Sequence, residues 1–351
     1  MTSTVTVGGS RTMDEIVLLK HGSGGRAMRR LITEIFAAGF VDDVVDGVGL
    51  AAMDDGAAIR IGNQWLVVTT DAHVVQPAFF PGGDIGRLAV SGTVNDLAMM
   101  GAVRPLGLTS AIVIEEGFRR ADLLRIHDSM RQACAEAGTT IVTGDTKVMG
   151  RGELDGIIIT TTGVALADRI VPDAGLEPGD AILLTGTMGD HGIALMAKRH
   201  ELEFGVELLS DVAPLNRLVE AALAAGPVSA MKDPTRGGVA SALHEMASKS
   251  GVGIVIEEPR VPVRPTVRAA AEMLGLDPFH IANEGKALLG VRGGDAVVNA
   301  VLAAIRAHPL GQDAAVIGRA VAAEPGRVVL DTGLGRRLLA EPEGVPLPRI
   351  C

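Results

Sequence analysis

The chain has 351 residues, of which 47% are hydrophobic, and a formal net charge of −10. This length exceeds what one hydrophobic core usually holds, so we expect two folded domains. Nucleic-acid binding normally uses a basic surface or aromatic rings for stacking, and the acidic balance with only 2% aromatic residues disfavours it. No apolar stretch approaches the roughly 20 residues of a membrane helix, so no membrane-spanning segment is predicted.

The first residues and the cysteines bear on cellular location. Residues 1–10 lack the basic region followed by an apolar region that marks a secretory signal. The two cysteines, Cys134 and Cys351, are too few for a disulfide framework or a cysteine zinc cluster. We therefore expect the reducing cytoplasm.

The first half of the chain alternates strand-like and helix-like segments. The pattern predicts strands at residues 65–70, 106–114, 140–142 and 156–166, and helices at 84–100 and 119–137. Gly138 follows the second helix as its C-cap. Several strands succeed one another without an intervening helix, which favours α+β layers over a strict βαβ repeat.

Residues 167–179 carry two prolines and two glycines and form the predicted linker. A second series follows, with strands at 181–185 and 253–257 and helices at 192–199, 240–250 and 296–307.

The end of the sequence has a composition of its own. Residues 341–351 hold three prolines and show no amphipathic period, so we expect an extended, mobile tail. The predicted units are a domain at residues 1–167, a domain at 168–340 and this tail.

Seven aspartates each close an apolar run and are flanked by small residues. They are Asp54, Asp55, Asp71, Asp96, Asp145, Asp190 and Asp233. A single aspartate of this kind is most often a turn residue or a helix cap. Magnesium prefers carboxylate, water and phosphate oxygens, and a polyphosphate needs such ions to sit among so many carboxylates. The set as a whole indicates a magnesium-dependent phosphate site.

Three glycine-rich turns lie at residues 21–26, 185–189 and 233–238. Glycine permits close backbone approach, and the N–H groups of such a turn can cradle phosphate, above all before a helix. None of the turns has the P-loop spacing GxxxxGK[ST], and each alone is equally compatible with an ordinary turn. Arg236 in the third turn adds a cation that suits a phosphate.

Lys147 follows the letters GDT, and Glu284 lies in ANEGK. Both residue types usually lie on the surface, so a structural role and a catalytic role are about equally compatible with their position. His21, His73 and His191 lack metal-ligand spacing, and we expect them to be solvated or hydrogen-bonded.

Cys351 is the last residue, in the closing letters PRIC. Eleven extended residues reach on the order of 35 Å, so we expect an exposed thiol that moves between a pocket and a partner. The position is not a prenylation box, in which the cysteine lies four residues from the end. The alternative is an inert trailing thiol.

These motifs together resemble the HypE family of carbamoyl dehydratases, which help to build the cyanide ligands of [NiFe]-hydrogenase. The resemblance spans essentially the whole chain and rests on HGSGG, MDDGAA, the segment from TTDAH to LAMMGA, TGDTKV, DPTRGG, ANEGK and PRIC. The central motifs are shared with the wider ATP-binding superfamily of aminoimidazole ribonucleotide synthetase, and the PRIC ending is what singles out HypE.

The resemblance implies a two-domain α+β fold of the aminoimidazole ribonucleotide synthetase type. It also implies a homodimer whose N-terminal domains pair into a barrel, with ATP near that interface. The implied partners are the carbamoyltransferase HypF, which would load Cys351, and the HypC–HypD complex, which would accept the cyano group.

The resemblance further implies site residues. ATP would phosphorylate the carbamoyl oxygen on Cys351, Glu284 would take the nitrogen proton, and Lys147 would stabilise the developing oxyanion or help to shuttle a proton. The implied magnesium ligands are Asp54, Asp55, Asp71, Asp96 and Asp233. The implied nucleotide-binding residues are Gly22, Ser23, Gly24, Gly25, Asp145, Thr146, Arg236 and Gly237.

Two other functions are compatible with the sequence. One is another amide-activating synthetase of the superfamily that acts on a diffusing substrate, which should tolerate loss of residues 348–351. A selenophosphate synthetase is disfavoured, because the N-terminal glycine-rich region has no cysteine. The other is a non-enzymatic carrier or scaffold, which predicts no ATP hydrolysis.

Overall fold

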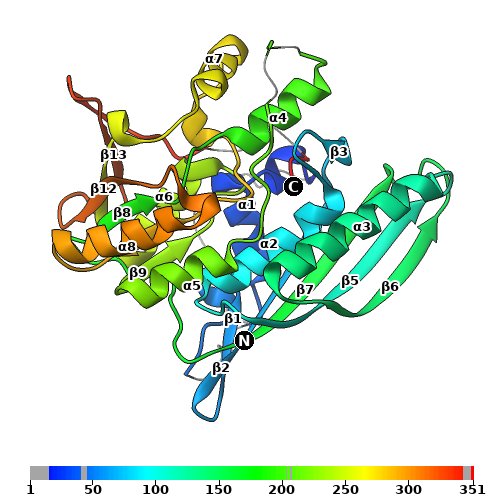
Figure 1. Ribbon diagram of the computed structural model, residues 1–351, viewed down its shortest axis with the longest axis horizontal. Coiled ribbons are helices and arrows are strands. Elements are labelled where there is room, and N and C mark those ends of the chain that lie inside the picture. Colours follow the sequence, from blue (N-terminus) through cyan, green and yellow to red (C-terminus); the bar gives the residue numbers. More distant parts are fainter. Residues whose placement is uncertain (1–15, 41–45, 203, 206–207, 343–348) are drawn as a thin grey trace, which may run out of the picture.

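The computed structural model describes residues 16–40, 46–202, 204–205, 208–342 and 349–351. Two mixed α/β units lie side by side, one formed by the first half of the chain and one by the second (Figure 1). The predicted α+β architecture is confirmed, and a five-stranded sheet and a seven-stranded sheet organise the two units.

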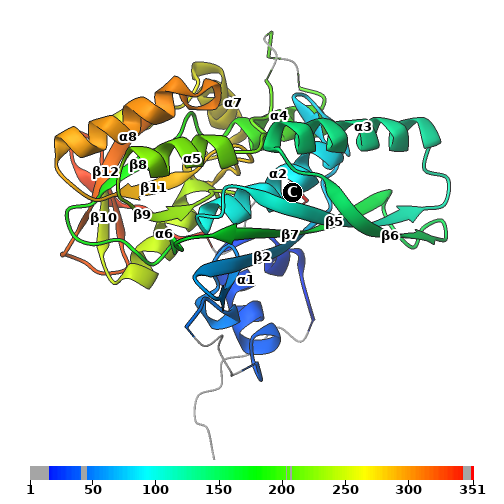
Figure 2. The same cartoon turned by 60° about the horizontal axis from the view of Figure 1, so that its bottom comes forward.

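The first sheet has the strand order β1-β2-β7-β5-β6. Its strands are β1 (Ala57–Ile61), β2 (Gln64–His73), β5 (Pro105–Glu115), β6 (Ile141–Met149) and β7 (Ile157–Ala167). Helices α2 (Ile85–Met99) and α3 (Arg120–Ala137) cover one face, and the short helix α1 (Gly25–Leu31) lies beyond the other (Figure 2). Strand β7 alternates buried and partly buried residues along most of its length, as expected of a sheet with one covered face.

Helix α2 is almost wholly buried and positions the first part of the site. Asp84 caps its N-terminus, because Oδ1 accepts hydrogen bonds from the N–H groups of Gly86 and Arg87 at 2.8 and 3.0 Å. A side chain at Gly92 would come within 2.8 Å of Nε2 of His73, so glycine lets α2 approach β2 closely. This approach brings Asp96 on α2 to Thr69 on β2.

The second sheet has the strand order β14-β13-β10-β12-β8-β11-β9. Its strands are β8 (Ala181–Leu184), β9 (Val228–Lys232), β10 (Gly253–Glu257), β11 (Leu288–Val291), β12 (Ala315–Val321), β13 (Val328–Asp331) and β14 (Arg336–Leu338). Ile182 and Leu184 pack in one core with helix α6 (Gly238–Ser250), whereas Leu183 packs in another with helices α5 (Asn216–Ala225) and α8 (Asp295–Ala307). Successive side chains of β8 thus pack in the cores on opposite faces of the sheet.

The other α-helices and β-strands are β3 (Phe79–Phe80), β4 (Gly83–Asp84), α4 (Asp190–Arg199) and α7 (Pro265–Leu274). Apolar contacts join the two units. Ala98 and Met99 at the end of α2 share a core with Leu183 of the second sheet. Residues of α4 and α7 in turn pack with the core of the first unit. The two units therefore bury apolar surface against each other.

The predicted strands and helices lie where the structure has them, with two corrections. Strand β2 continues through Asp71 to His73, and β6 runs to Met149, so residues 143–149 form a strand where only 140–142 were predicted. Parallel pairing with β5 extends β6, and sequence periodicity does not report such a long-range partner. Helices α1, α5 and α7 were not predicted, nor were strands β1, β3, β4, β9 and β11 to β14.

The prediction of a mobile tail is partly wrong. Residues 343–348 lie outside the described residues, but the flanking residues pack on the body. The N–H of Arg26 donates to the carbonyl of Pro342 at 3.2 Å, and Ile350 is only 3% exposed. The chain end lies near the middle of the molecule, close to α2 and β3 (Figure 1).

Candidate active site

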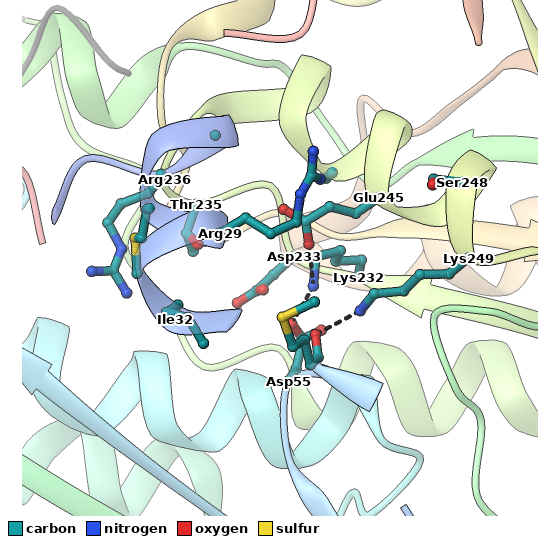
Figure 3. A pocket seen from close by; sticks show the side chains of 15 residues that line it. Arg29, Ile32, Asp55, Lys232, Asp233, Thr235, Arg236, Glu245, Ser248 and Lys249 are labelled. Carbon is teal, nitrogen blue, oxygen red and sulfur yellow. Dashed lines mark hydrogen bonds and ion pairs between the residues drawn. The ribbon is translucent and has the colours of Figure 1, made fainter. Parts of the chain in front are cut away.

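A cavity of about 320 Å³ lies at the junction of the two units, between α1 and α6. Gly24, Gly25 and Asp55 line it from the first unit, and Asp233 and Arg236 from the second. Figure 3 shows Arg29 of α1 reaching across it toward α6, which contributes Glu245, Ser248 and Lys249. The sequence therefore folds so that two of its three glycine-rich turns and part of its aspartate series meet at one cavity.

The predicted metal ligands lie in one cluster, in which each carboxylate is near another. Asp55 precedes β1, Asp71 lies on β2, Asp96 on α2, and Asp233 follows β9. Oγ of Thr69 lies 2.9 Å from Oδ2 of Asp96 and 2.9 Å from the main-chain oxygen of Asp55. Strand β2 thus ties the loop before β1 to helix α2.

Burial and mutual repulsion raise the pKa of most of these carboxyl groups. The pKa of Asp54 rises to about 7 through burial and the nearby charges of Asp173 and Asp55. That of Asp233 rises to about 8 through burial and Asp55. The pKa of Asp96 is raised well above its ordinary value by burial and by repulsion from its carboxylate neighbours. Such a cluster favours a bound cation, which would relieve the repulsion.

Asp71 is the exception in this cluster. Burial opposes the charge of Asp71, but His73 and Arg236 lower its pKa below the ordinary value. Nε2 of His73 lies 3.1 Å from Oδ2 of Asp71. Asp71 therefore stays ionised.

The first and third glycine-rich turns approach each other closely. A side chain at Gly24, where φ is +80°, would lie 2.9 Å from the carbonyl oxygen of Arg236. Helix α6 begins after Gly237, whose φ is +85°, and no side chain caps its N-terminus. An uncapped helix N-terminus presents free N–H groups and a positive dipole end to an anion. The meeting of the turns thus makes a cradle that suits a phosphate.

The first turn contributes its residues unequally. Gly24 and Gly25 line the cavity, Ser23 is buried and donates its hydroxyl to the carbonyl of Leu19 at 2.7 Å, and Gly22 is exposed. The hydroxyl of Ser23 is therefore engaged within its own turn.

Glu284 is buried rather than on the surface, with 3% of its area exposed. Asn95 of α2 donates to its main-chain oxygen at 3.3 Å, and Asp211 accepts from its N–H at 3.1 Å. Its Oε1 atom has no hydrogen-bond partner. Burial, followed by the charges of Asp233 and Asp71, raises the pKa of Glu284 well above its ordinary value. A carboxyl group with a raised pKa and a free oxygen is suited to proton transfer.

Cys351 enters this cluster, and the prediction of an exposed thiol is wrong. Cys351 is only partly exposed. Burial raises the pKa of its thiol, Arg236 opposes this, and Glu284 and Asp71 raise it further. The last residue of the sequence thus lies within electrostatic reach of the candidate base and of the phosphate-cradle arginine.

Comparison with known proteins decides the family. The family models for AIR synthase related protein match residues 53–167 with the N-terminal domain and residues 177–331 with the C-terminal domain. Carbamoyl dehydratase HypE of Cupriavidus necator is 49% identical over 361 residues, covering 100% of both chains. The chain belongs to the HypE family of carbamoyl dehydratases.

Two solved structures of this family are similar to the chain. The crystal structure of a HypE–HypF complex matches with a TM-score of 0.82 and 43% identity, covering 89% of this chain and 99% of that one. A HypE structure in complex with ATP matches with a TM-score of 0.78 and 43% identity, covering 96% of this chain and 100% of that one. The two-domain AIR synthase-like fold is thereby confirmed.

Three residues implied by the HypE resemblance are not brought to the cavity within one chain. Asp145, Thr146 and Lys147 lie on β6, where Nζ of Lys147 pairs with Oδ2 of Asp145 at 2.7 Å and both side chains are exposed.

The strand registers give their separation from the site. Asp71 pairs with Thr161 on β7, Thr161 with Ser110 on β5, and Ser110 with Gly144 on β6. Three strand spacings, about 14 Å in all, therefore lie between Asp71 and β6.

Five charged residues of the site were missed from the sequence: Arg29, Asp173, Lys232, Glu245 and Lys249. Nζ of Lys232 lies 2.6 Å from Oδ1 of Asp55 and 3.3 Å from Oε2 of Glu245, while Nζ of Lys249 lies 2.6 Å from Oδ2 of Asp173. Burial disfavours the charge of Lys232, but Asp55, Glu245 and Asp173 raise its pKa well above the ordinary value. Lys232 directly precedes the DPTRGG motif, which is the one signal that could have suggested it.

The residues present fit magnesium and ATP. Among the described residues, no three His, Cys, Asp or Glu side chains form a ready metal cage. Magnesium is usually held by one or two carboxylates together with the phosphates of a substrate. The buried Oδ2 atom of Asp55 has no partner, and the carboxylate cluster adjoins the phosphate cradle. Within the part of the chain that the structure describes, no helix is long and apolar enough to span a membrane.

Proposed function

We propose that the chain uses ATP to dehydrate a carbamoyl group carried on Cys351, and so supplies cyanide for the iron of a [NiFe]-hydrogenase. The supporting observation is that Cys351 lies within electrostatic reach of Arg236 and Glu284 and of the buried carboxylates. A carrier or scaffold has no need of this arrangement. A synthetase acting on a diffusing substrate would have no reason to place its own last residue there.

The chemistry follows from the poor leaving ability of an amide oxygen. The carbamoyl oxygen of S–C(=O)–NH₂ attacks the γ-phosphorus of ATP, and the bond from that phosphorus to the β-phosphate oxygen breaks, releasing ADP. The C–O bond then breaks and phosphate leaves with its electron pair, while both nitrogen protons are removed. The products are S–C≡N, ADP and phosphate. Phosphoryl transfer of this kind depends chiefly on positioning and charge neutralisation.

Each group of residues then has a role. Magnesium, when bound, neutralises phosphate charge, and the proposed ligands are drawn from Asp54, Asp55, Asp71, Asp96 and Asp233. The backbone of Gly24, Gly25 and Gly237 with the guanidinium of Arg236 binds phosphate oxygens. Glu284, buried and with an unpartnered oxygen, accepts a proton from the nitrogen.

We also propose a homodimer in which the first sheets of two chains pair into a barrel. Strand β6 supports this, because it is an edge strand with exposed apolar residues, Val142 at 60% and Val148 at 69%. An uncovered edge of this kind invites pairing with another chain. Lys147, Asp145 and Thr146 would then serve the site of the partner subunit, and Lys147 would stabilise charge on the carbamoyl oxygen.

The partners proposed for this chain follow its reaction. A HypE relative has been solved in a complex with HypF, and HypF would load the carbamoyl group. The HypC–HypD complex would accept the cyano group. The free thiol of Cys351 suits the reducing cytoplasm. Within this proposal, residues 1–167 form the ATP-binding and dimerisation domain, residues 168–340 the second domain, and residues 341–351 the tail that carries the group.

The test is mass spectrometry of the tail. The chain is carbamoylated by HypF, freed of HypF, incubated with Mg-ATP, and its C-terminal peptide is weighed. Loss of one water, about 18 Da, is expected because base-assisted dehydration removes it. Cys351→Ser, which leaves the nucleotide cavity intact, is the control that cannot be loaded. A carbamoyl peptide of unchanged mass after complete ATP turnover would refute the proposal.

A further inference from the structure

The last three residues of the chain lie along residues 74–76 in an antiparallel arrangement. The N–H of Val74 donates to the carbonyl of Cys351 at 3.1 Å, and the N–H of Gln76 donates to that of Arg349 at 3.2 Å. The carbonyl between them, that of Ile350, faces the other way and meets Nε2 of His191 at 2.7 Å. All three main-chain oxygens are thus engaged, alternately on two sides.

The side chain of Ile350 occupies an apolar seat. It is 3% exposed and packs in the same core cluster as Ile281 and Ile193. A Cβ atom at Gly192, in the first turn of α4, would lie 2.4 Å from Cγ2 of Ile281 and 3.3 Å from Cδ1 of Ile350. Glycine therefore lets α4 approach Ile281 closely, and Ile350 packs beside this contact.

His191 is held in one orientation and one tautomer. The ring is fully buried and stands edge-on to Phe80, with 5.3 Å between ring centroids. The N–H of Val212 donates to Oγ of Ser210 at 3.1 Å, and Oγ lies 2.8 Å from Nδ1 of His191. Since the carbonyl of Ile350 only accepts, Nε2 carries the hydrogen. Nδ1 of the neutral ring then accepts from the hydroxyl of Ser210.

We propose that His191 and the seat of Ile350 fix the register in which the tail docks, so that the sulfur of the next residue faces Arg236 and Glu284. Ile350 is then the specificity residue of the tail, and His191 is a positioning residue. Arg349 has a φ of +58°, but the main-chain oxygens of residues 349–351 face alternate sides, and side chains alternate with them. A shift by one residue would therefore turn the sulfur away. The effect on dehydration rests on the proposed function, whereas docking does not.

Docking is tested first, on the tail without its carbamoyl group. In a Cys134→Ala background, alkylation of Cys351 by iodoacetamide is followed by mass spectrometry. Ile350→Asp and His191→Leu should each speed alkylation about tenfold or more, because each removes a contact that holds the tail. A tenfold change corresponds to a loss of docking free energy of about 1.4 kcal/mol. Ile350→Val and His191→Gln, which keep an apolar side chain and an N–H donor, should stay near the parent rate. Equal rates in all variants would overturn the proposal.

Register is tested with a matched pair of insertions. One alanine placed between Ile350 and Cys351 changes the phase of the sulfur relative to the seat, whereas one alanine placed directly before Arg349 keeps it. The insertion between Ile350 and Cys351 should lower the single-turnover rate of dehydration about 100-fold or more. The KM for ATP should change little, as expected when a reacting group is misplaced. The second should retain most of the rate. Equal loss in both would contradict a register role.

The dehydration proposal and the docking proposal can be refuted independently of each other. If the parent chain, once carbamoylated, never loses water, the proposed function is wrong. The alkylation rates of Ile350→Asp and His191→Leu then still decide whether these residues dock the tail.

Discussion

Nζ of Lys232 lies 2.6 Å from Oδ1 of Asp55, and this ion pair crosses from the second unit of the molecule to the first. Lys232 ends β9, while Asp55 precedes β1, and the two side chains are 11% and 9% exposed. Asp173 and Glu245 also lie within 3.5 Å of the same ammonium group. One buried cation thus holds together three carboxylates at the floor of the proposed active site.

Lys232→Met should therefore destabilise the protein strongly. Removing one partner of a buried ion pair leaves uncompensated buried charge, at a cost of about 3–5 kcal/mol. Urea unfolding followed by circular dichroism measures this change. The matched control is Arg104→Met, since Arg104 pairs with Glu220 on the surface at 2.6 Å, and exposed pairs contribute about 0–1 kcal/mol. Similar midpoints for the two variants would show that the Lys232 cluster is not needed for stability.

Glu284→Gln should abolish dehydration while leaving carbamoylation of Cys351 by HypF intact. Loss of a general base typically lowers the rate about 10²–10⁴-fold. Burial raises the pKa of Glu284 well above its ordinary value of 4.5, and a base works in its ionised form. The single-turnover rate of the parent should therefore rise with pH over a range well above 4.5, and Glu284→Gln should lose that rise. Full dehydration by Glu284→Gln would exclude this residue as the base.

A mixed dimer tests whether Lys147 acts on the partner subunit. Lys147→Ala and Cys351→Ser homodimers should both be inactive, for different reasons. In a mixed dimer, the chain that keeps Cys351 faces the chain that keeps Lys147, so one site is complete. Equal mixing with free exchange should restore about a quarter of parent activity, because half the dimers are mixed and each has one working site. If Lys147 served its own chain, no activity would return on mixing.

Docking of the tail should weaken as the pH falls below 6.5. Burial lowers the pKa of His191 below its ordinary value of 6.5 and Arg199 lowers it further, whereas Asp211 and the hydrogen bond to the carbonyl of Ile350 favour the charged ring without reversing the shift. Above pH 6.5 the ring is neutral whether docked or exposed. Below 6.5 the undocked form takes up a proton that the docked form refuses, so the docked state loses free energy relative to it.

Alkylation of Cys351 in the Cys134→Ala background checks this. After correction for the intrinsic reactivity of the thiol with a short peptide of residues 346–351, the parent should become more accessible between pH 6.5 and 5. His191→Gln, which does not titrate there, should show no such trend. A parallel response in both would assign the pH dependence to another group.

Much of the local structure followed from the sequence. Helices α2, α3 and α8 were predicted to within about two residues, because their apolar periodicity, the cap at Asp84 and the glycine at Gly138 are local signals. The aspartates and the glycine-rich turns predicted a phosphate site, because carboxylates bind magnesium and glycine-rich turns can bind phosphate. Cys351 and the PRIC ending pointed to the family that the comparisons confirmed.

Only the tertiary structure decided how these parts meet. It buried Glu284, placed Lys232 between Asp55 and Asp173, and left Lys147 on an exposed edge about three strand spacings, or about 14 Å, from Asp71. It also folded Ile350 onto His191. The reason is physical: propensity and periodicity act between neighbours in sequence, whereas burial, ion pairing and strand order depend on contacts between residues up to hundreds of positions apart.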